Sequence, residues 1–554
     1  MKITSPVRRP IFRLLPKACA AAALIGLSAL PSAHAASGTW SSLSTGNWST
    51  AGNWNGGVVA DGSGNTAFFN ALDLTANVTV HLDTARTIGS LNIGDTTATF
   101  FNYTIDNNSS GANVLTLAGG TPTITVATSN TATISAEISG TSGLVKAGGG
   151  NLILSGVNTY SGTTSVTNSS GGFVQFNADS AFGSSTLLVS SQNGGLKFGA
   201  VVNDLRAITF SSLGGGGRID TSGFDITYSS TLSGTIGAGN FFTKIGNGTL
   251  TLAGTNNIGG AGGVNVSGGF LQIDSNARLG NGTGGLTLNI SGGGIKFGAA
   301  FNDLRATTLG TSGGTLDTNG FSVTVSSTIA STGAGALVKA GSGTLTLTAN
   351  NTYAGPTTVN AGTLLINGTH SGTGAVTVAS TAALGGTGAI AGATTINSGG
   401  KLGALDGSGN AFTLSNASAV ALNISAAVGG ANTGALVFEL GSVANSDKIV
   451  LSSLTSGLSI GTAVLNFNDF SFTALSGFGG GTYTLFDTNT AITGTLGSSL
   501  TGTINGLNAT ISLGDSGHDI VLTVAVPEPS TVAMLTLGGV GCLVWRIRRR
   551  IARS

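Results

Sequence analysis

Hydrophobic and polar residues alternate along much of the chain. In residues 343–348 leucines alternate with threonines, so that an extended backbone would place the leucines on one face. Residues 357–360 and 363–366 continue the alternation, and Asn350 and Gly362 mark turns between such segments. No segment between residues 37 and 525 has a convincing 3.6-residue period. The pattern predicts an all-β fold made of many short strands joined by turns.

The strands belong to a repeated unit of about 95–99 residues. LVKAGGGNLILSGVNTYSG begins at Leu144 and LVKAGSGTLTLTANNTYAG at Leu337, and a related copy lies between them. The lysines of the three copies are Lys146, Lys244 and Lys339. A second block, GGLKFGAVVNDLRAITF from Gly194, recurs as GGIKFGAAFNDLRATTL from Gly293. Such internal repetition indicates a repeat architecture rather than several unrelated domains.

A parallel β-helix, or β-solenoid, is the architecture that these features favour. Sandwiches, barrels and propellers can also bury short strands without crossover helices, and a propeller stays open as the weaker alternative. Frequent glycine suits the corners of a solenoid, and stacked Asn, Ser and Thr side chains can pair with their own kind. Charged residues make up 8% of the chain, which limits like-charge stacking between coils. Coils of roughly 20–25 residues would give some 20 coils and a rod about 100 Å long.

Charge and cysteine content exclude several classes of function. Between residues 37 and 525 the chain has 12 basic and 20 acidic residues, so we expect no nucleic-acid partner. The two cysteines, Cys19 and Cys542, lie in terminal apolar segments. The body therefore has no disulfide framework, thiolate zinc site or cysteine nucleophile.

The N-terminus has the layout of a cleavable secretory signal. Residues 1–36 comprise a basic stretch, an apolar core at 18–30 and the small-residue tripeptide Ala33-His34-Ala35. We expect a cleavable signal peptide at 1–36, with Ala33 and Ala35 as the small residues of the cleavage site, and export through Sec-type machinery.

The C-terminus, residues 526–554, has three parts in order. Pro527-Glu528-Pro529 precedes an apolar run at 531–545, which a basic cluster follows. The basic residues are Arg546, Arg548, Arg549 and Arg550. The run would form a short transmembrane helix of about 22 Å, with the arginines on the cytoplasmic side. This tail resembles the PEP-CTERM sorting signal, which implies an exosortase-type partner and transient anchoring in the inner membrane. The protein would then reside in the cell envelope, on the surface or outside the cell.

The repeated block is similar to the autotransporter-associated β-strand repeat. The resemblance rests on Lys-x-Gly-x-Gly-x-Leu-x-Leu followed by Asn, Tyr and Gly, and the copy that contains Tyr353 matches best. The first copy keeps Tyr160, whereas the second has Ile258 at that place. The resemblance implies an exported β-helical passenger. We expect a signal peptide at 1–36, an N-terminal β-rich cap at 37–142, β-helical repeats at 143–400, a C-terminal β-rich cap at 401–525 and the sorting signal at 526–554.

The body has few groups suited to catalysis, and we assign no catalytic, cofactor-binding or metal-binding residue. Asp204 and Arg206 lie together in Asn-Asp-Leu-Arg, which recurs at Asn302 to Arg305. Because enzymes rarely build one active site twice, we interpret each cluster as a turn that an Asp–Arg pair closes. The three histidines of the body are interpreted as solvent or turn residues rather than ligands; they are His81, His370 and His518.

Calcium is the one ion for which the sequence offers suitable loops. Residues 61–65 and 406–410 both read Asp-Gly-Ser-Gly-Asn, which places oxygen-bearing side chains at alternate positions. Ordinary Asx turns explain the same letters, and we expect no required cofactor.

The leading hypothesis is therefore a non-enzymatic, exported structural or adhesive β-solenoid, with extracellular polysaccharide as a candidate partner. One alternative is a β-helical polysaccharide lyase or hydrolase, which would need carboxylates and a basic residue in one groove. Another is recognition of ice or a crystalline glycan by rows of threonine.

Overall fold

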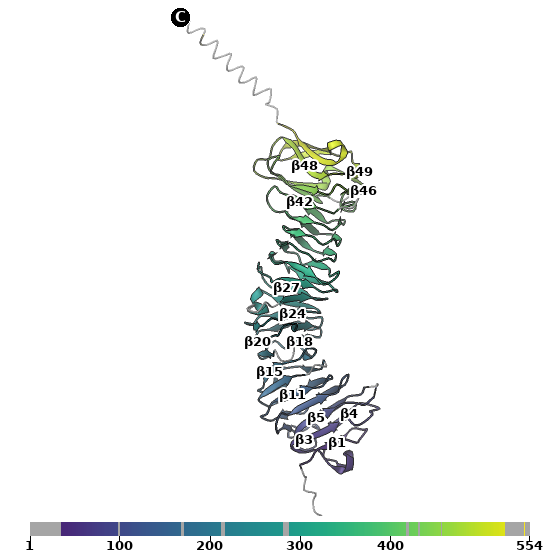
Figure 1. Ribbon diagram of the computed structural model, residues 1–554, viewed down its shortest axis with the longest axis vertical. Helices are drawn as coiled ribbons and strands as arrows, with labels where there is room; N and C mark the ends of the chain where they lie inside the picture. The colour runs from purple at the N-terminus through teal and green to yellow at the C-terminus, as the bar shows by residue number, and fades with distance from the viewer. Residues whose placement is uncertain are drawn as a thin grey trace, which may run out of the picture.

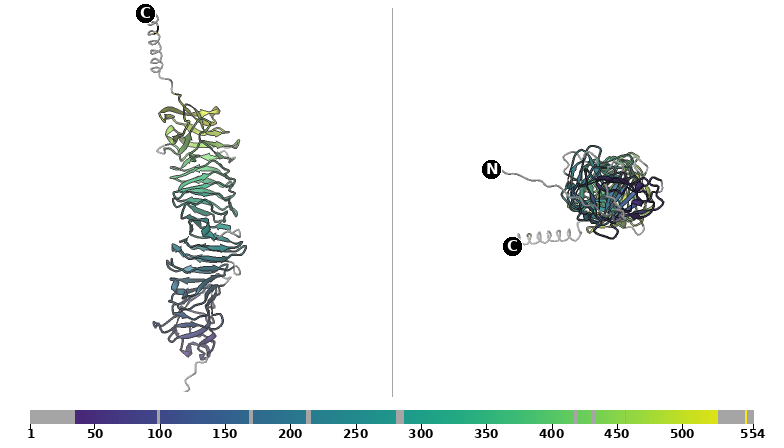
Figure 2. Two further views of the ribbon diagram at one scale, coloured as in Figure 1. Left: turned by 90° about the vertical axis from the view of Figure 1, so that its left-hand side faces the viewer. Right: turned by 90° about the horizontal axis from the view of Figure 1, so that it is seen from below.

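The computed structural model describes residues 35–97, 100–167, 171–211, 216–280, 287–416, 420–429, 433–455 and 457–526, together with Arg548. They form an elongated, all-β parallel solenoid of about 15 turns, which confirms the predicted fold. The chain advances along the long axis from one end of the rod to the other (Figures 1 and 2). The turns are fewer than the expected 20. Two late coils are long, since Thr395 pairs with Asn423 and Asn423 with Ser459, and the last strands pair antiparallel instead of adding turns.

Two sheets build most of the N-terminal half. Sheet I has twelve strands: β1 (Gly38–Thr39), β3 (Gly62–Phe69), β5 (Arg86–Ile93), β7 (Leu115–Leu117), β8 (Thr123–Val126), β10 (Ile138–Ser139), β11 (Leu144–Ala147), β13 (Thr163–Val166), β15 (Thr186–Val189), β17 (Ile208–Phe210), β20 (Leu232–Thr235) and β23 (Asn257–Gly259). Sheet II has thirteen: β2 (Gly46–Asn47), β4 (Val78–His81), β6 (Tyr103–Asp106), β9 (Thr131–Ile134), β12 (Asn151–Leu154), β14 (Phe173–Phe176), β16 (Gly195–Phe198), β18 (Gly216–Asp220), β21 (Phe241–Ile245), β24 (Gly263–Val266), β26 (Thr287–Ile290), β28 (Thr307–Leu309) and β31 (Ile329–Ser331).

Three further sheets build the C-terminal half. Sheet III has twelve strands: β19 (Ile226–Tyr228), β22 (Thr249–Leu252), β25 (Phe270–Ile273), β27 (Gly294–Phe297), β29 (Gly314–Asp317), β32 (Leu337–Ala340), β34 (Thr357–Val359), β37 (Val376–Val378), β40 (Thr394–Ile396), β43 (Leu422–Asn423), β46 (Leu458–Leu465) and β49 (Thr493–Leu496). Sheet IV has seven: β30 (Val323–Val325), β33 (Thr344–Leu347), β35 (Gly362–Ile366), β38 (Ala382–Gly385), β41 (Lys401–Gly403), β44 (Leu436–Leu440) and β47 (Phe470–Ala474). Sheet V has eight: β36 (Thr369–His370), β39 (Ala389–Ile390), β42 (Ala411–Leu414), β45 (Lys448–Leu451), β48 (Gly481–Thr488), β52 (Asp519–Val524), β51 (Leu507–Gly514) and β50 (Thr501–Ile504).

Short 3-10 helices join some of these strands: η1 (Ala51–Asn53), η2 (Asn55–Gly57), η3 (Asp179–Phe182), η4 (Asn276–Leu279), η5 (Phe467–Asp469) and η6 (Asp515–Gly517).

The alternation of the sequence produces the core directly. In β33, β34 and β37 every second residue is buried and its neighbours face outward. Because the coils stack in register, inward residues form ladders along the rod. One ladder of sheet IV runs through Leu345, Leu364, Leu384, Leu402 and Leu436 to Phe470. The five leucines are fully buried, so each rung covers the apolar surface of the one before it.

The two ends of the solenoid are closed differently. At the N-terminal end Trp40, Trp48 and Trp54 are buried around Phe69, with ring centroids 5.2–5.8 Å apart. At the C-terminal end, sheet V turns from parallel to antiparallel pairing at β48, β52, β51 and β50.

Several predicted signal residues lie outside the described residues, namely Ala33, Pro527, Glu528, Pro529, Arg546, Arg549 and Arg550. Ala35 and Arg548 are described, and both are exposed. Within the part of the chain that the structure describes, no helix has the length and apolar character needed to span a membrane.

Candidate functional site

The lysines of the three repeats are buried inside the solenoid. Lys146, Lys244 and Lys339 are each 0% exposed. The Nζ of Lys339 donates to the carbonyl oxygens of Ala340 (2.9 Å), Gly341 (2.7 Å) and Ala361 (2.9 Å). Burial lowers the pKa of Lys146 to about 7 and that of Lys244 and Lys339 to about 8. The ammonium group thus closes a corner of the coil and is shielded from solvent.

The glycines of the same motif make this corner possible. Gly341 has φ +76°, a conformation that L side chains rarely adopt, and its carbonyl is one of those that accept from Lys339. At Gly343 a Cβ atom would lie 1.9 Å from the carbonyl oxygen of Phe321 in the preceding coil. Lys-x-Gly-x-Gly is therefore a structural clamp between coils.

The asparagine and tyrosine of the motif are also interior groups. Asn351 is 0% exposed, and its Oδ1 accepts from the backbone N–H of Ile329 at 2.8 Å. The hydroxyl of the buried Tyr353 lies 2.8 Å from Oγ1 of Thr357. The signature residues that the sequence shows most clearly thus hold the coils together and do not face a ligand.

The Asn-Asp-Leu-Arg clusters are built differently from the prediction. Arg206 does not pair with Asp204: its Nε and Nη2 donate to the carboxylate of Asp179 at 2.9 and 2.6 Å. Asp179 belongs to the preceding coil, and the same guanidinium also binds backbone carbonyls there. In the second copy Nε of Arg305 donates to Oδ1 of Asn276 at 2.9 Å. The interpretation as a turn closed by its own Asp–Arg pair was wrong, because the arginine reaches one rung back to bind a carboxylate or amide.

One of the three histidines is buried, contrary to the expectation. His370 is 1% exposed and stacks on Tyr353, with ring centroids 4.1 Å apart. Burial lowers its pKa. His81 lies at the surface, and its Nδ1 is 2.7 Å from the carboxylate of Asp106.

One of the two proposed calcium loops lies beside other carboxylates. Carboxylate oxygens of Asp406, Glu439 and Asp447 all lie within 4.8 Å of one another, and among the described residues these three form the cluster that could hold a hard cation. Asp447 is 1% exposed and accepts from the backbone N–H groups of Asn410 and Glu439. Burial raises its pKa to about 6, and the charges of Glu439 and Asp406 add to this effect. In the other loop the carboxylate of Asp61 pairs with Arg86 at 3.0 Å.

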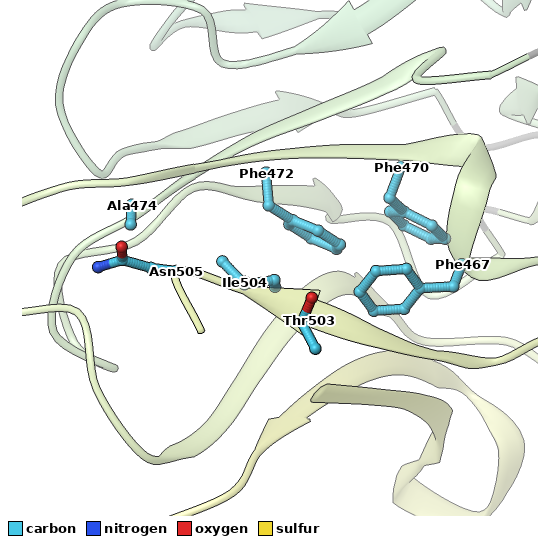
Figure 3. Close-up of a pocket in the computed structure, with 7 residues that line it drawn as sticks. All are labelled: Phe467, Phe470, Phe472, Ala474, Thr503, Ile504 and Asn505. Atoms are coloured by element: carbon cyan, nitrogen blue, oxygen red, sulfur yellow. The ribbon is translucent and has the colours of Figure 1, made fainter. Parts of the chain in front are cut away.

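A groove lies at the C-terminal end of the rod, where sheet IV stops (Figure 3). Its volume is about 500 Å³. It is lined by Phe467, Phe470, Phe472, Ala474, Thr503, Ile504 and Asn505. A smaller hollow of about 280 Å³ shares Phe467 and is lined further by Asn466, Asn468, Ser499 and Thr501.

The groove exists because one inward-facing row has no next rung. β47 is the last strand of sheet IV, and Phe470, Phe472 and Ala474 continue the buried row of Leu436, Phe438 and Leu440. Exposure rises along this last strand: Phe470 is 6% exposed, Phe472 is half-buried and Ala474 is exposed. Sequence reasoning missed the groove, since its residues form no motif and only the end of the sheet brings them together. The run Phe467 to Phe472, with three phenylalanines in six residues, is the signal that could have pointed to it.

Comparison with known families supports the two predicted resemblances. Residues 144–168, 242–273 and 337–366 match the family model of the passenger-associated-transport-repeat. Residues 525–550 match the PEP-CTERM protein-sorting motif. A search of curated proteins finds no match to the chain. The sorting motif implies export, location at the envelope or surface, and sorting by an exosortase-type enzyme.

Proposed function

We propose that this protein is a non-enzymatic rod that is sorted through its C-terminal signal to the cell surface or the extracellular matrix, where it acts as a structural or adhesive element. The observation that carries the proposal is the single elongated stack of coils (Figure 1), whose last strand, β52, ends at Val524, directly before the residues 525–550 that match the sorting motif. A rod whose C-terminal end is held at the envelope would present its other end at a distance from the membrane.

The polar chemistry of the repeats supports a structural role. The repeat lysines, asparagines and tyrosines bind backbone or neighbouring side chains inside the stack. The outward residues are mainly small and neutral, such as Thr358, Thr377 and Thr395, which stand in register on sheet III. A neutral outer face avoids like-charge repulsion between successive coils, so the rod can be extended by adding units.

The sorting signal can be tested directly in the full chain. Replacing both Pro527 and Pro529 by alanine should leave the protein in the membrane fraction with its tail uncleaved. Fractionation and intact-mass measurement would report this, with Pro356→Ala as a control that alters a proline in the body. An unchanged mature mass and location in the double variant would contradict the proposed sorting step.

Surface display needs a second measurement. A short epitope inserted after Gly56, in the exposed segment of the N-terminal end, should be accessible to antibody on intact cells. An epitope that becomes accessible only after lysis would rule out a surface rod, whatever the fate of the tail.

A further inference from the structure

We propose that the groove at the C-terminal end of the solenoid, lined by Phe467, Phe470, Phe472, Thr503 and Asn505, binds a neutral polysaccharide. The inference rests on the proposed function and deepens it, because it gives the surface rod a specific site and a ligand class. Nothing in the repeat motifs supplies such a site, since their polar residues are enclosed within the coils.

Two of the aromatic residues, Phe467 and Phe472, offer ring surface of the kind that sugars use, and the buried Phe470 packs beside Phe472. Phe470 and Phe472 project from β47 with ring planes 4° apart and centroids 5.5 Å apart, and Phe467 lies 5.6 Å from Phe472 (Figure 3). Phe467 and Phe472 are both half-buried, so each keeps part of its ring accessible. The C–H groups on one face of a pyranose pack against such rings, which excludes water from apolar surface on both partners.

The polar part of the lining suits hydroxyl groups rather than charges. Thr503 and Asn505 reach the groove from β50 and its turn, and the adjoining hollow adds Asn468, Ser499 and Thr501. Within the described chain, the side chains of Thr503 and Asn505 make no hydrogen bond to another protein group. Amide and hydroxyl groups both donate and accept hydrogen bonds, as sugar hydroxyls do.

No ionised side chain is available in the groove to select a charged ligand. None of the residues that line the two hollows is ionisable. The nearest carboxylate along the chain, Asp469, is 0% exposed and accepts from the backbone N–H groups of Gly429 and Asn466. An anionic polysaccharide would lose hydration here without gaining a cationic partner. Charge complementarity therefore favours a neutral glycan.

An extended peptide is the other ligand that such a place could receive, because β47 ends sheet IV and β50 ends sheet V. A Cβ atom at Gly502 would lie 2.1 Å from Cε1 of Phe467, so the ring rests directly on the backbone of β50. This contact covers a face of β50 and not its hydrogen-bonding edge, so the experiment below includes a peptide as a separate outcome.

The experiment uses the mature protein purified from the cell-surface fraction and isothermal titration with defined hexasaccharides. Neutral probes are cellohexaose, maltohexaose and xylohexaose, and the anionic probe is hexagalacturonate. We expect at least one neutral probe to bind and hexagalacturonate not to bind. Failure of all three neutral probes, or preference for the anionic one, would overturn the assignment.

Variants place the binding in the groove. Phe472→Leu keeps an apolar side chain but removes the ring, and should weaken the affinity at least tenfold, while Asn505→Ala should weaken it about threefold. Phe321→Leu, the same change at a half-buried phenylalanine of another coil, is the matched control and should bind as the unchanged protein does. Binding that Phe472→Leu leaves unaltered would show that the sugar site is elsewhere.

Two further arms separate the outcomes. The acetylated, amidated peptide Gly-Thr-Leu-Thr-Leu-Thr, the sequence of residues 343–348, serves as a strand probe; Phe472-dependent binding of this peptide alone would replace the glycan by a polypeptide partner. Surface display of Phe472→Leu, measured with the epitope at Gly56, should be normal. Loss of display would instead contradict the rod hypothesis or indicate misfolding, and so would be distinguishable from failure of the binding site.

Discussion

The repeats at residues 143–400 and the C-terminal region at 401–525 stack their coils in the same way. They differ in what is buried: the repeats enclose polar side chains, whereas the C-terminal region exposes apolar ones. In the repeats, polar residues such as Lys339 and Asn351 are buried and engaged with backbone groups. In the C-terminal region, apolar residues reach the surface. Among the residues that the structure describes, the large exposed hydrophobic residues of the repeats are Val157 and Val201, whereas those of the C-terminal region are Val420, Val443, Leu454, Val464 and Leu513.

This difference teaches where recognition belongs in a solenoid. A middle rung is covered on both sides by neighbouring coils, so its motif residues can hold the stack together. A terminal rung is covered on one side, and the row that ends at Phe470 and Phe472 leaves a groove. The repeats therefore give length, and the end gives a binding surface.

The largest effect is expected when a buried lysine is removed from the repeats. Lys339→Met would leave the carbonyls of Ala340, Gly341 and Ala361 without their donor inside the coil. We expect a loss of about 3 kcal/mol in the free energy of local opening, because buried carbonyls without partners are costly. Hydrogen exchange at β32 and β34 measures it, with the exposed Lys401→Met in the C-terminal region as control. Equal protection in the two variants would refute the clamp.

A smaller but still local effect is expected at the second glycine of the motif. Gly343→Ala would force a Cβ atom against the carbonyl oxygen of Phe321, so the two coils must separate. We expect Gly343→Ala to lower the free energy of unfolding by about 2 kcal/mol. Gly223→Ala is the matched control, because a Cβ atom there meets nothing within 4 Å. Thermal unfolding followed by circular dichroism compares the two, and a similar midpoint for both would contradict the close approach between coils.

The fold could be predicted from the sequence because its determinants are local and repeated. Alternating Thr and Leu in residues 343–348 sets one buried face, and the glycines of Lys-x-Gly-x-Gly mark a corner. The partner of Arg206 could not be predicted, because Asp179 lies one coil away. Neither the sequence around Arg206 nor that around Asp179 determines how the two coils align. The burial of the repeat lysines was missed for a related reason: charge normally indicates a surface, and only the stacked backbone supplies the carbonyls. The groove needs the end of a sheet, which no local pattern encodes.

The two copies of the arginine cluster provide a comparison within the repeats. Arg206 binds the carboxylate of Asp179, whereas Arg305 binds the amide of Asn276 in the equivalent place. Replacement by lysine should lower the free energy of local opening by about 1.5 kcal/mol at Arg206 and by about half of that at Arg305. The loss is larger at Arg206 because its bidentate bonds to a carboxylate are stronger than bonds to an amide oxygen. Hydrogen exchange in η3 and η4 measures the two losses. Losses of equal size would mean that the carbonyl contacts, rather than the carboxylate, hold the arginine.

The smallest effect is expected when a carboxylate of the C-terminal region is replaced, and it concerns the dependence of stability on pH. Stability should change with pH in the opposite direction here from the direction expected in the repeats. Burial raises the pKa of Asp447 from 3.8 to about 6, so between these values the folded state holds a proton that the unfolded state releases, and stability falls as the pH rises. Lys146 has a lowered pKa of about 7, so its coil should instead gain stability as the pH rises from 7 toward 10.5.

Glu439→Gln keeps an acceptor for the N–H of Gly407 but removes one of the charges that raise the pKa of Asp447. The pH at which β44 and β45 lose protection against hydrogen exchange, corrected for the intrinsic exchange rate, should therefore move to a lower value. Glu137→Gln, a half-buried glutamate far along the rod, should leave that pH unchanged, and a pH dependence in β44 and β45 that Glu439→Gln does not move would mean that burial alone sets the pKa of Asp447.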